Sequence, residues 1–257
     1  MAKIALVIGG GRGLGAHLSK RMAREGYEVA VADLVGENAR KVAADISAAG
    51  SRAMAFTVDV CVEKDVRELV AAVVREFGRI DSLIYNVGAT ISAKITEFEL
   101  KTFQFLLDVN LTGYFLCARE VAKQMIKQGG PGSIIVINSK TGKVGSKFNP
   151  GYSAAKFGVV GLTQSLALDL AEHNIRVNSM MLGNMLDSEM FESLIPQYAV
   201  KLGIPESEVK KVYIEKVPLK RGCQVEDVAN AVAFYSSDQA SYLTGQAVNI
   251  TGGQVMH

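Results

Sequence analysis

Tryptophan, histidine and cysteine are scarce in this chain. Its 257 residues include no tryptophan, three histidines and three cysteines. The cysteines are far apart in the sequence, as expected in a reducing compartment rather than in a disulfide-rich secreted protein. No histidine has a second ligand at zinc-site spacing, so we interpret His17, His173 and His257 as surface or helix-end residues and expect no metal site.

Neither a charge of one sign nor a long apolar run dominates the sequence. The 28 basic and 26 acidic residues leave a net charge of +2, which is too small to favour a nucleic acid or a membrane surface as a partner. The longest apolar runs, such as residues 4–8, have the length of a strand and not the roughly 20 residues of a membrane span. The first expected strand begins at Lys3, so we expect no signal peptide and a cytoplasmic protein.

Short β-branched segments alternate with amphipathic helical segments along the chain. We expect strands at residues 3–8, 27–32, 52–58, 82–85, 133–137, 176–181 and 247–250, and helices at 13–25, 37–49, 63–77, 100–128, 152–172 and 225–237. This alternation predicts an α/β fold, a Rossmann-type doubly wound parallel sheet of seven strands with helices on both faces. Residues 1–257 should form a single dinucleotide-binding and catalytic domain.

Only the segment 182–220 breaks the alternation, and it holds three of the five prolines. Irregular segments of this length are uncommon inside a compact domain and are usually functional. We therefore expect a substrate-side lid insertion, with a surface excursion of two short helices as the alternative.

A glycine-rich turn, Gly9-Gly10-Gly11-Arg12-Gly13-Leu14-Gly15, joins the first expected strand to the first helix. Glycines let the backbone approach a pyrophosphate closely, and the N–H groups at a helix start favour negative charge. A glycine cluster alone could be a tight turn, but its place between a strand and a helix predicts a dinucleotide site.

An acidic residue, Asp33, follows the second expected strand, twenty positions after Gly13. A carboxylate there accepts hydrogen bonds from the adenosine ribose and repels a 2′-phosphate. Arg12 favours the opposite preference, because a guanidinium can pair with that phosphate. A buried contact between like charges costs more than a partly solvated arginine gains, so we expect NAD rather than NADP.

Tyr152 and Lys156 lie four positions apart in an expected helix, and Ser139 follows the strand at 133–137. A phenol made more acidic by a nearby ammonium and a positive nicotinamide can take the proton of an alcohol as its hydride leaves. Ser139 can hydrogen-bond the substrate oxygen as charge develops. A Tyr–Lys pair arises by chance in about half of such chains, and the added serine lowers this to about 3–4%.

Together these residues resemble the short-chain dehydrogenase/reductase family over essentially the whole chain. The resemblance implies a cofactor site built from Gly9, Arg12, Gly13, Leu14, Gly15, Asp33, Asp59, Val60, Asn86, Gly88, Tyr152, Lys156 and Gly183. It also implies that Asn110 holds a water molecule in a proton relay with Lys156, beside Ser139 and Tyr152.

The sequence departs from the family pattern at several positions. Ile8 stands where a threonine is usual, and only Asn86 and Gly88 remain of the usual Asn-Asn-Ala-Gly turn. Gly183 follows a leucine where the family has proline, and Asp187 replaces a threonine. The family's side-chain hydrogen bond from that threonine to the nicotinamide carboxamide therefore does not carry over.

Segments on the expected substrate side, among them residues 138–147, 151–157, 216–223 and 251–256, resemble the family's dehydrogenases of phosphorylated polyols. This resemblance implies NAD-dependent oxidation of D-glucitol 6-phosphate to D-fructose 6-phosphate by a homotetramer.

Three lysines, Lys140, Lys143 and Lys147, follow Ser139 in a glycine-containing loop. A phosphate dianion favours such cations and flexible N–H donors. We therefore expect the substrate phosphate here, with Lys140 as the first candidate, against the equally common alternative of solvated loop lysines. The fallback site lies near the lid, at Lys216, Lys220 and Arg221.

Three other functions compete with this prediction. The chain could oxidise an unphosphorylated polyol or another secondary alcohol. It could reduce acyl-carrier thioesters, although Asp33 argues against the NADP that such enzymes use. It could also be a regulator that senses NADH without turnover, although a pure binder needs no proton relay.

Overall fold

The computed structural model describes residues 2–257 and contains one seven-stranded parallel sheet. The strands are β1 (Ile4–Ile8), β2 (Glu28–Asp33), β3 (Ala53–Thr57), β4 (Ser82–Tyr85), β5 (Gly132–Ser139), β6 (Ile175–Leu182) and β7 (Ala247–Ile250). Their order is β3-β2-β1-β4-β5-β6-β7, and every neighbouring pair is parallel. The strand order therefore reverses between β1 and β4, where open sheets of this kind bind ligands.

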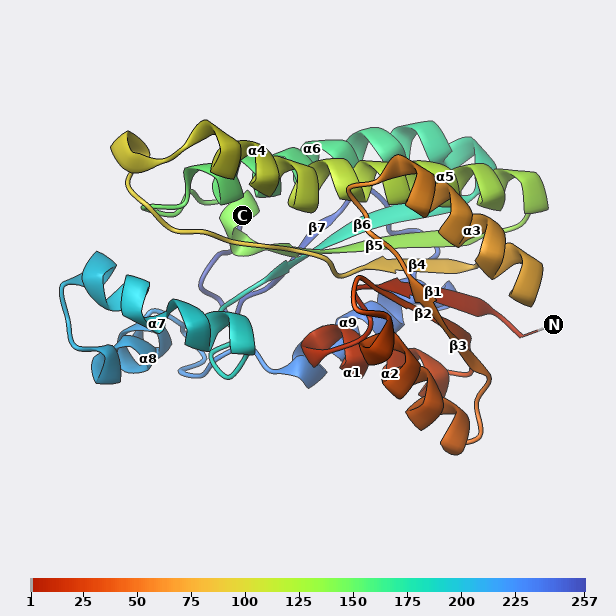
Figure 1. Cartoon of the computed structure of the whole chain (residues 1–257), viewed down its shortest axis with the longest axis horizontal. Helices are drawn as coiled ribbons and strands as arrows, with labels where there is room; N and C mark the ends of the chain where they lie inside the picture. The colour runs from red at the N-terminus through yellow and green to blue at the C-terminus, as the bar shows by residue number, and fades with distance from the viewer. Residues whose placement is uncertain (1) are drawn as a thin grey trace.

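Helices cover both faces of the sheet (Figure 1). One face carries α1 (Gly13–Arg24), α2 (Gly36–Ala48) and α9 (Val225–Ser236), and the other carries α3 (Glu63–Phe77), α4 (Leu100–Leu107), α5 (Gly113–Gln128) and α6 (Pro150–Leu170). A separate hydrophobic cluster lies between each helical layer and the sheet. The predicted doubly wound α/β fold is confirmed.

The uninterrupted apolar runs in the central strands follow from this double coverage. Every residue of β1 and β4 is buried, and β5 is buried from Gly132 to Asn138. Within residues 2–257 no helix has both the length and the apolar character needed to cross a membrane.

The helical segment expected at residues 100–128 contains an irregularity that the sequence pattern does not reveal. A π-helical turn, Asp108–Thr112, separates α4 from α5. Such a turn inserts an extra residue into a helix and is frequent at functional sites. Here it carries Asn110, which is fully buried.

The segment 182–220 contains two helices, α7 (Glu189–Leu202) and α8 (Glu206–Glu215). They extend beyond the sheet at the left of Figure 1. Phe191, Tyr198 and Tyr213 pack there, with ring centroids 5.2–5.4 Å apart. This α7–α8 lobe thus has a small hydrophobic cluster of its own, separate from the two main clusters.

Candidate active site

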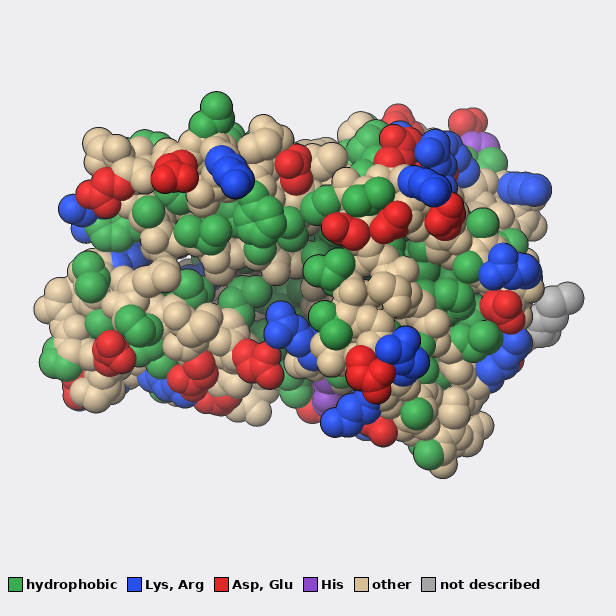
Figure 2. All heavy atoms as spheres, viewed as in Figure 1, with side chains coloured by type: hydrophobic (Ala, Val, Ile, Leu, Met, Phe, Trp, Pro, Cys, Tyr) green, Lys and Arg blue, Asp and Glu red, His purple; other side chains and the backbone are tan. Residues whose placement is uncertain are grey.

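The carboxyl ends of β1, β4, β5 and β6 lie at one edge of the sheet, because all four strands are parallel. The glycine turn, Asn86, Ser139 and Gly183 directly follow or end these strands. The space-filling view shows a hollow at this edge, between the layer that contains α4 and the α7–α8 lobe (Figure 2). The residues singled out in the sequence therefore gather at the place where a doubly wound fold binds ligands.

Close backbone contacts explain the glycines of the turn. Gly9 and Gly13 have φ angles of 73° and 50°, which favour glycine. A Cβ on Gly15 would overlap the carbonyl oxygen of Gly9, and Asn86 Nδ2 donates a 3.0 Å hydrogen bond to that same oxygen. Asn86 thus holds the turn against the end of β4.

The start of α1 is suited to an anionic group. No side chain caps it, and its first turn contains no acidic residue. A Cβ on Gly13 would meet no atom within 4 Å, so the turn leaves open space beside these N–H groups. Uncapped N–H groups beside an open glycine turn fit the pyrophosphate of a dinucleotide. Leu14, the second residue of α1, packs against the cluster beneath α1, α2 and α9.

Backbone N–H groups fix the carboxylate of Asp33 in place. Its Oδ2 accepts a hydrogen bond from Gly11 N at 2.9 Å, and its Oδ1 accepts one from Val35 N at 3.0 Å. Asp33 is only 9% exposed. Each carboxylate oxygen keeps lone pairs for a further donor, so this rigid acceptor fits the hydroxyls of a ribose.

Arg12 extends away from the buried Asp33. Its side chain is exposed, and Nη1 lies 3.5 Å from Glu189 Oε2 at the start of α7. This exposed ion pair links the glycine turn to the α7–α8 lobe, although such pairs contribute little to stability.

Asp59 and Val60 follow β3, as the sequence suggests. Asp59 Oδ1 accepts a hydrogen bond from Cys61 N at 2.9 Å, and Val60 is buried. Gly88 lies near Lys156 and Asn110, because an added Cβ would be 3.7 Å from Lys156 Nζ and 3.2 Å from Asn110 Oδ1. Only glycine leaves this space free.

Ser139, Tyr152 and Lys156 are brought together by β5 and α6. Ser139 is close enough to Tyr152 for its hydroxyl to lower the pKa of the phenol. Lys156 Nζ lies 5.5 Å from the centroid of the Tyr152 ring, and Lys156 is only 4% exposed. The Oγ of Ser139 also accepts a hydrogen bond from Thr141 N at 3.2 Å, which orients the serine.

Burial is the main cause of the shifted pKa values of Tyr152 and Lys156. Burial raises the pKa of Tyr152, and Ser139 lowers it. Burial lowers the pKa of Lys156 to about 8. The protein alone therefore does not make the phenol more acidic, because the increase in pKa caused by burial is larger than the decrease caused by Ser139. It requires the additional positive charge of the cofactor.

Asn110 is held rigidly by the backbone around it. Its Nδ2 donates to Leu106 O at 2.8 Å and to Ala89 O at 2.9 Å, and its Oδ1 accepts from Ala89 N at 3.3 Å. The π-helical turn therefore joins α4 to the segment after β4, beside Gly88 and Lys156.

After β6, Gly183 packs against β7 and Thr251, whereas Asp187 is exposed to solvent. Gly183 N donates to Ile250 O at 2.9 Å, and an added Cβ would lie 3.1 Å from Thr251 Cα. Asp187 is exposed and accepts a hydrogen bond from Lys210 of α8 at 3.2 Å. Asp187 thus pairs with a side chain of the α7–α8 lobe, which differs from the role that the family pattern gives to a threonine at this position.

The three loop lysines point to different partners. Lys143 Nζ donates to Ala247 O at 2.7 Å, which directs it to β7. Lys147 Nζ lies 4.9 Å from the centroid of the Phe148 ring. Lys140 has neither contact and lines a cavity of about 450 Å³ together with Ser146 and residues 253–257.

The fallback residues Lys216, Lys220 and Arg221 follow α8. Lys201, which the sequence analysis did not single out, lies in α7. Lys216 directly follows α8, and Lys201, near the end of α7, donates to Ser146 Oγ at 2.9 Å. Lys220 and Arg221 instead bind Glu215 O and Asp227. No local motif marks Lys201, because only the fold brings it to the loop after β5.

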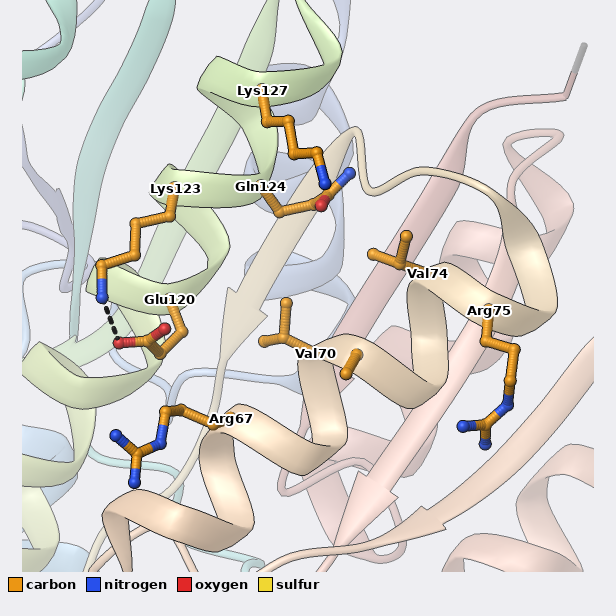
Figure 3. A pocket seen from close by; sticks show the side chains of 9 residues that line it. Arg67, Val70, Val74, Arg75, Glu120, Lys123, Gln124 and Lys127 are labelled. Atoms are coloured by element: carbon orange, nitrogen blue, oxygen red, sulfur yellow. Dashed lines mark hydrogen bonds and ion pairs between the residues drawn. The ribbon is translucent and has the colours of Figure 1, made fainter.

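A second hollow lies outside this site, between α3 and α5 (Figure 3). Arg67 and Arg75 flank it from α3, and Lys123, which pairs with Glu120 at 2.8 Å, lies on α5. None of the residues singled out in the sequence lines it. Within residues 2–257 no group of three or more His, Cys, Asp or Glu side chains is arranged to hold a metal ion.

The chain is similar to proteins of one known family. A family model described as short chain dehydrogenase matches residues 3–199. The sorbitol-6-phosphate 2-dehydrogenase of Escherichia coli (strain K12) is 56% identical over 258 residues, and the match covers 100% of both chains.

Solved structures agree with this assignment. The crystal structure of sorbitol-6-phosphate 2-dehydrogenase from Erwinia amylovora has a TM-score of 0.97 at 58% identity and covers 98% of this chain and 100% of that chain. The structure of an NAD⁺-bound xylitol dehydrogenase has a TM-score of 0.93 at 33% identity and covers 98% of each chain. The family resemblance of the sequence is confirmed, and with it an oxidoreductase that binds a nicotinamide cofactor. The chain belongs to the short-chain dehydrogenase family.

Proposed function

We propose that this protein oxidises D-glucitol 6-phosphate at C2 to D-fructose 6-phosphate, with NAD as the hydride acceptor. The observation that carries the reaction type is the buried Lys156, whose Nζ lies 5.5 Å from the centroid of the Tyr152 ring, with Ser139 close enough to lower the pKa of Tyr152. The observation that supports the substrate is the 56% identity to a sorbitol-6-phosphate 2-dehydrogenase over the full chain.

In this proposal Tyr152 takes the proton of the substrate hydroxyl at C2. Ser139, which lies close to Tyr152, donates to the substrate oxygen as negative charge develops there. When bound, NAD supplies the hydride acceptor and a positive charge that favours the phenolate. Because burial raises the pKa of Tyr152, the free protein keeps this hydroxyl protonated, and the base is active only in the cofactor complex.

Lys156 and Asn110 prepare the return of the proton to solvent. Lys156 is buried with a pKa of about 8, so its ammonium can lose and regain a proton near neutral pH. Asn110 lies beside it and uses its side-chain donors on the backbone. We propose that Lys156 also holds the nicotinamide ribose, and that Asn110 positions the water molecule that accepts the proton.

The preference for NAD rests on Asp33. Its carboxylate is almost fully buried and fixed by two backbone N–H groups, so it cannot turn away from a 2′-phosphate. Arg12 is exposed and engaged with Glu189, so it offers little compensation. The NAD-bound state of the similar xylitol dehydrogenase supports the same preference.

The decisive experiment follows NADH formation by absorbance with D-glucitol 6-phosphate, D-glucitol and a panel of other alcohols. We expect the phosphate ester to have the highest kcat/KM, and Tyr152→Phe to reduce kcat by about 10²–10⁴-fold. A rate with NADP equal to that with NAD would contradict the role of Asp33. A Tyr152→Phe variant with the parent's rate would refute the mechanism.

The similarity to a xylitol dehydrogenase supports a second candidate function, oxidation of an unphosphorylated polyol. The same panel separates the two, since this candidate requires D-glucitol or xylitol to be the better substrate.

We further propose that segment 182–220 acts as a lid and that the protein is a cytoplasmic homotetramer. The contact between Arg12 of the glycine turn and Glu189 at the start of α7 supports the lid. The exposed apolar side chains Leu100 and Phe105 of α4 and Phe157 and Leu168 of α6 support self-association. Sedimentation analysis tests the tetramer, and a monomer at micromolar concentration would contradict it.

A further inference from the structure

Three lysines near the hollow lack an acidic partner. Lys140 directly follows Ser139, Lys201 lies in the last turn of α7, and Lys216 directly follows α8. Within residues 2–257 none of the three forms an ion pair with a carboxylate. By contrast, Lys210 and Lys211 of α8 are each paired with acidic side chains. The three cations therefore lack the counter-ions that the lysines within α8 have.

The first two of these lysines meet at the loop after β5. Lys201 Nζ donates to Ser146 Oγ at 2.9 Å, and Ser146 and Lys140 line the same cavity of about 450 Å³. The end of α7 thus lies against the loop that begins at Ser139, although the two segments are some sixty positions apart in the sequence.

An aromatic pair places the third lysine in the same region. The rings of Tyr198 and Tyr213 are 5.2 Å apart between centroids. Lys201 Nζ lies 5.8 Å from the centroid of Tyr198, and Lys216 Nζ lies 5.3 Å from that of Tyr213. The α7–α8 lobe therefore presents two ammonium groups on neighbouring rings, facing the loop that carries Lys140.

The three cations repel one another, which indicates that their arrangement serves an anion. Burial, followed by the charges of Lys201 and Lys216, lowers the pKa of Lys140 to about 8. Burial, Lys216 and Lys147 lower the pKa of Lys201. Partly buried like charges without counter-ions destabilise a fold, and such clusters in a cleft are typical of ligand sites.

The cluster also lies at a suitable place relative to the reacting centre. Lys140 is the immediate neighbour of Ser139, and Tyr198 is close enough to Tyr152 for an ionised Tyr152 to raise its pKa. In a hexitol 6-phosphate oxidised at C2, the phosphate is several bonds from the reacting carbon. The phosphate should therefore lie near the catalytic trio without touching it.

Resting on the proposed function, we propose that Lys140, Lys201 and Lys216 together bind the phosphate group of the substrate. Two of the three cations belong to the α7–α8 lobe, so this lobe is the principal determinant of selectivity for a phosphate ester over a free polyol. Lys143 is not part of the subsite, because its Nζ donates to Ala247 O. Lys147, whose charge acts on Lys201, lies at the margin of the cluster.

The test measures kcat/KM for D-glucitol 6-phosphate and for D-glucitol in the full-length protein and in Lys201→Met and Lys216→Met variants. A hydrogen bond to a charged group is worth about 10- to 100-fold in affinity. We expect the ratio of the two kcat/KM values to fall by about that factor in each variant. We also expect inorganic phosphate to compete with the phosphate ester, with an inhibition constant that rises by a similar factor in each variant. Lys211→Met, which replaces an exposed lysine of α8, is the matched control.

The outcomes separate the two proposals. If the parent protein does not oxidise D-glucitol 6-phosphate, the proposed function fails. If the parent does oxidise it but both lysine variants keep the parent's ratio and phosphate inhibition, the subsite assignment is overturned. Equal losses with both substrates would overturn it as well, because they would indicate only a structural role. Lys216 is exposed, so its variant keeps the test valid if Lys201→Met does not fold.

Discussion

Replacing Lys156 with methionine should stabilise the protein while abolishing its activity. The Lys156 side chain is almost completely buried, and within residues 2–257 its ammonium forms neither an ion pair nor a hydrogen bond. Burial lowers its pKa from the ordinary 10.5 to about 8. Each pKa unit corresponds to about 1.4 kcal/mol, so the charged lysine costs the folded state about 3 kcal/mol. Methionine has a similar length and no charge.

The stability difference between the parent and the Lys156→Met variant should depend on pH. Below pH 8 the lysine is charged in both states, and the full penalty is present. Between about 8 and 10.5 the folded protein releases the proton first, so the stability of the parent rises with pH and approaches that of the variant. Above 10.5 only packing distinguishes the two proteins.

Thermal denaturation followed by circular dichroism, without cofactor, measures the effect. For a domain of this size about 3 kcal/mol corresponds to a rise in Tm of about 6–12 °C. We expect this rise at pH 7 and a much smaller one at pH values above 10.5. Lys211→Met should leave the Tm unchanged at both. A Lys156→Met variant no more stable than the parent at neutral pH, or a difference independent of pH, would refute the reasoning.

Three further predictions follow from the cofactor and phosphate contacts. Asp33→Ala should raise kcat/KM with NADP relative to NAD by about 10–100-fold. The variant should also have a lower Tm, because Gly11 N and Val35 N lose their acceptor. An unchanged ratio of the two kcat/KM values would contradict this prediction. Gly15→Ala should abolish the fluorescence change on NADH binding, because the added Cβ would overlap Gly9 O; normal binding would contradict it. The selectivity for the phosphate ester over D-glucitol should fall as pH rises through about 8, since Lys140 then loses its charge, whereas a pH-independent selectivity would exclude Lys140 from the subsite.

The sequence alone predicts the sheet and most of the site because the governing patterns are local. The helix at 63–77 and the strands at 82–85 and 247–250 have the predicted limits, since apolar periodicity and turn residues define them. The residues after β1, β4, β5 and β6 meet because strand ends of a parallel sheet share one edge. Alternation of strands and helices was sufficient to predict that edge.

Other features depend on contacts that no local pattern encodes. No sequence motif marks the π-helical turn at Asp108–Thr112, and only the folded structure reveals it. Lys201 reaches the loop after β5 through tertiary structure. The burial that raises the pKa of Tyr152 in the protein without cofactor is a property of the folded interior.

The π-helical turn also limits how this part of the chain can vary. One residue advances an α-helix by about 100° around its axis. Deleting a residue from Asp108–Thr112 would therefore rotate α4 by about that angle relative to α5, and would detach Asn110 from Leu106 or Ala89. Alignments with active relatives should thus tolerate length changes in the loop before β5 but none across this turn.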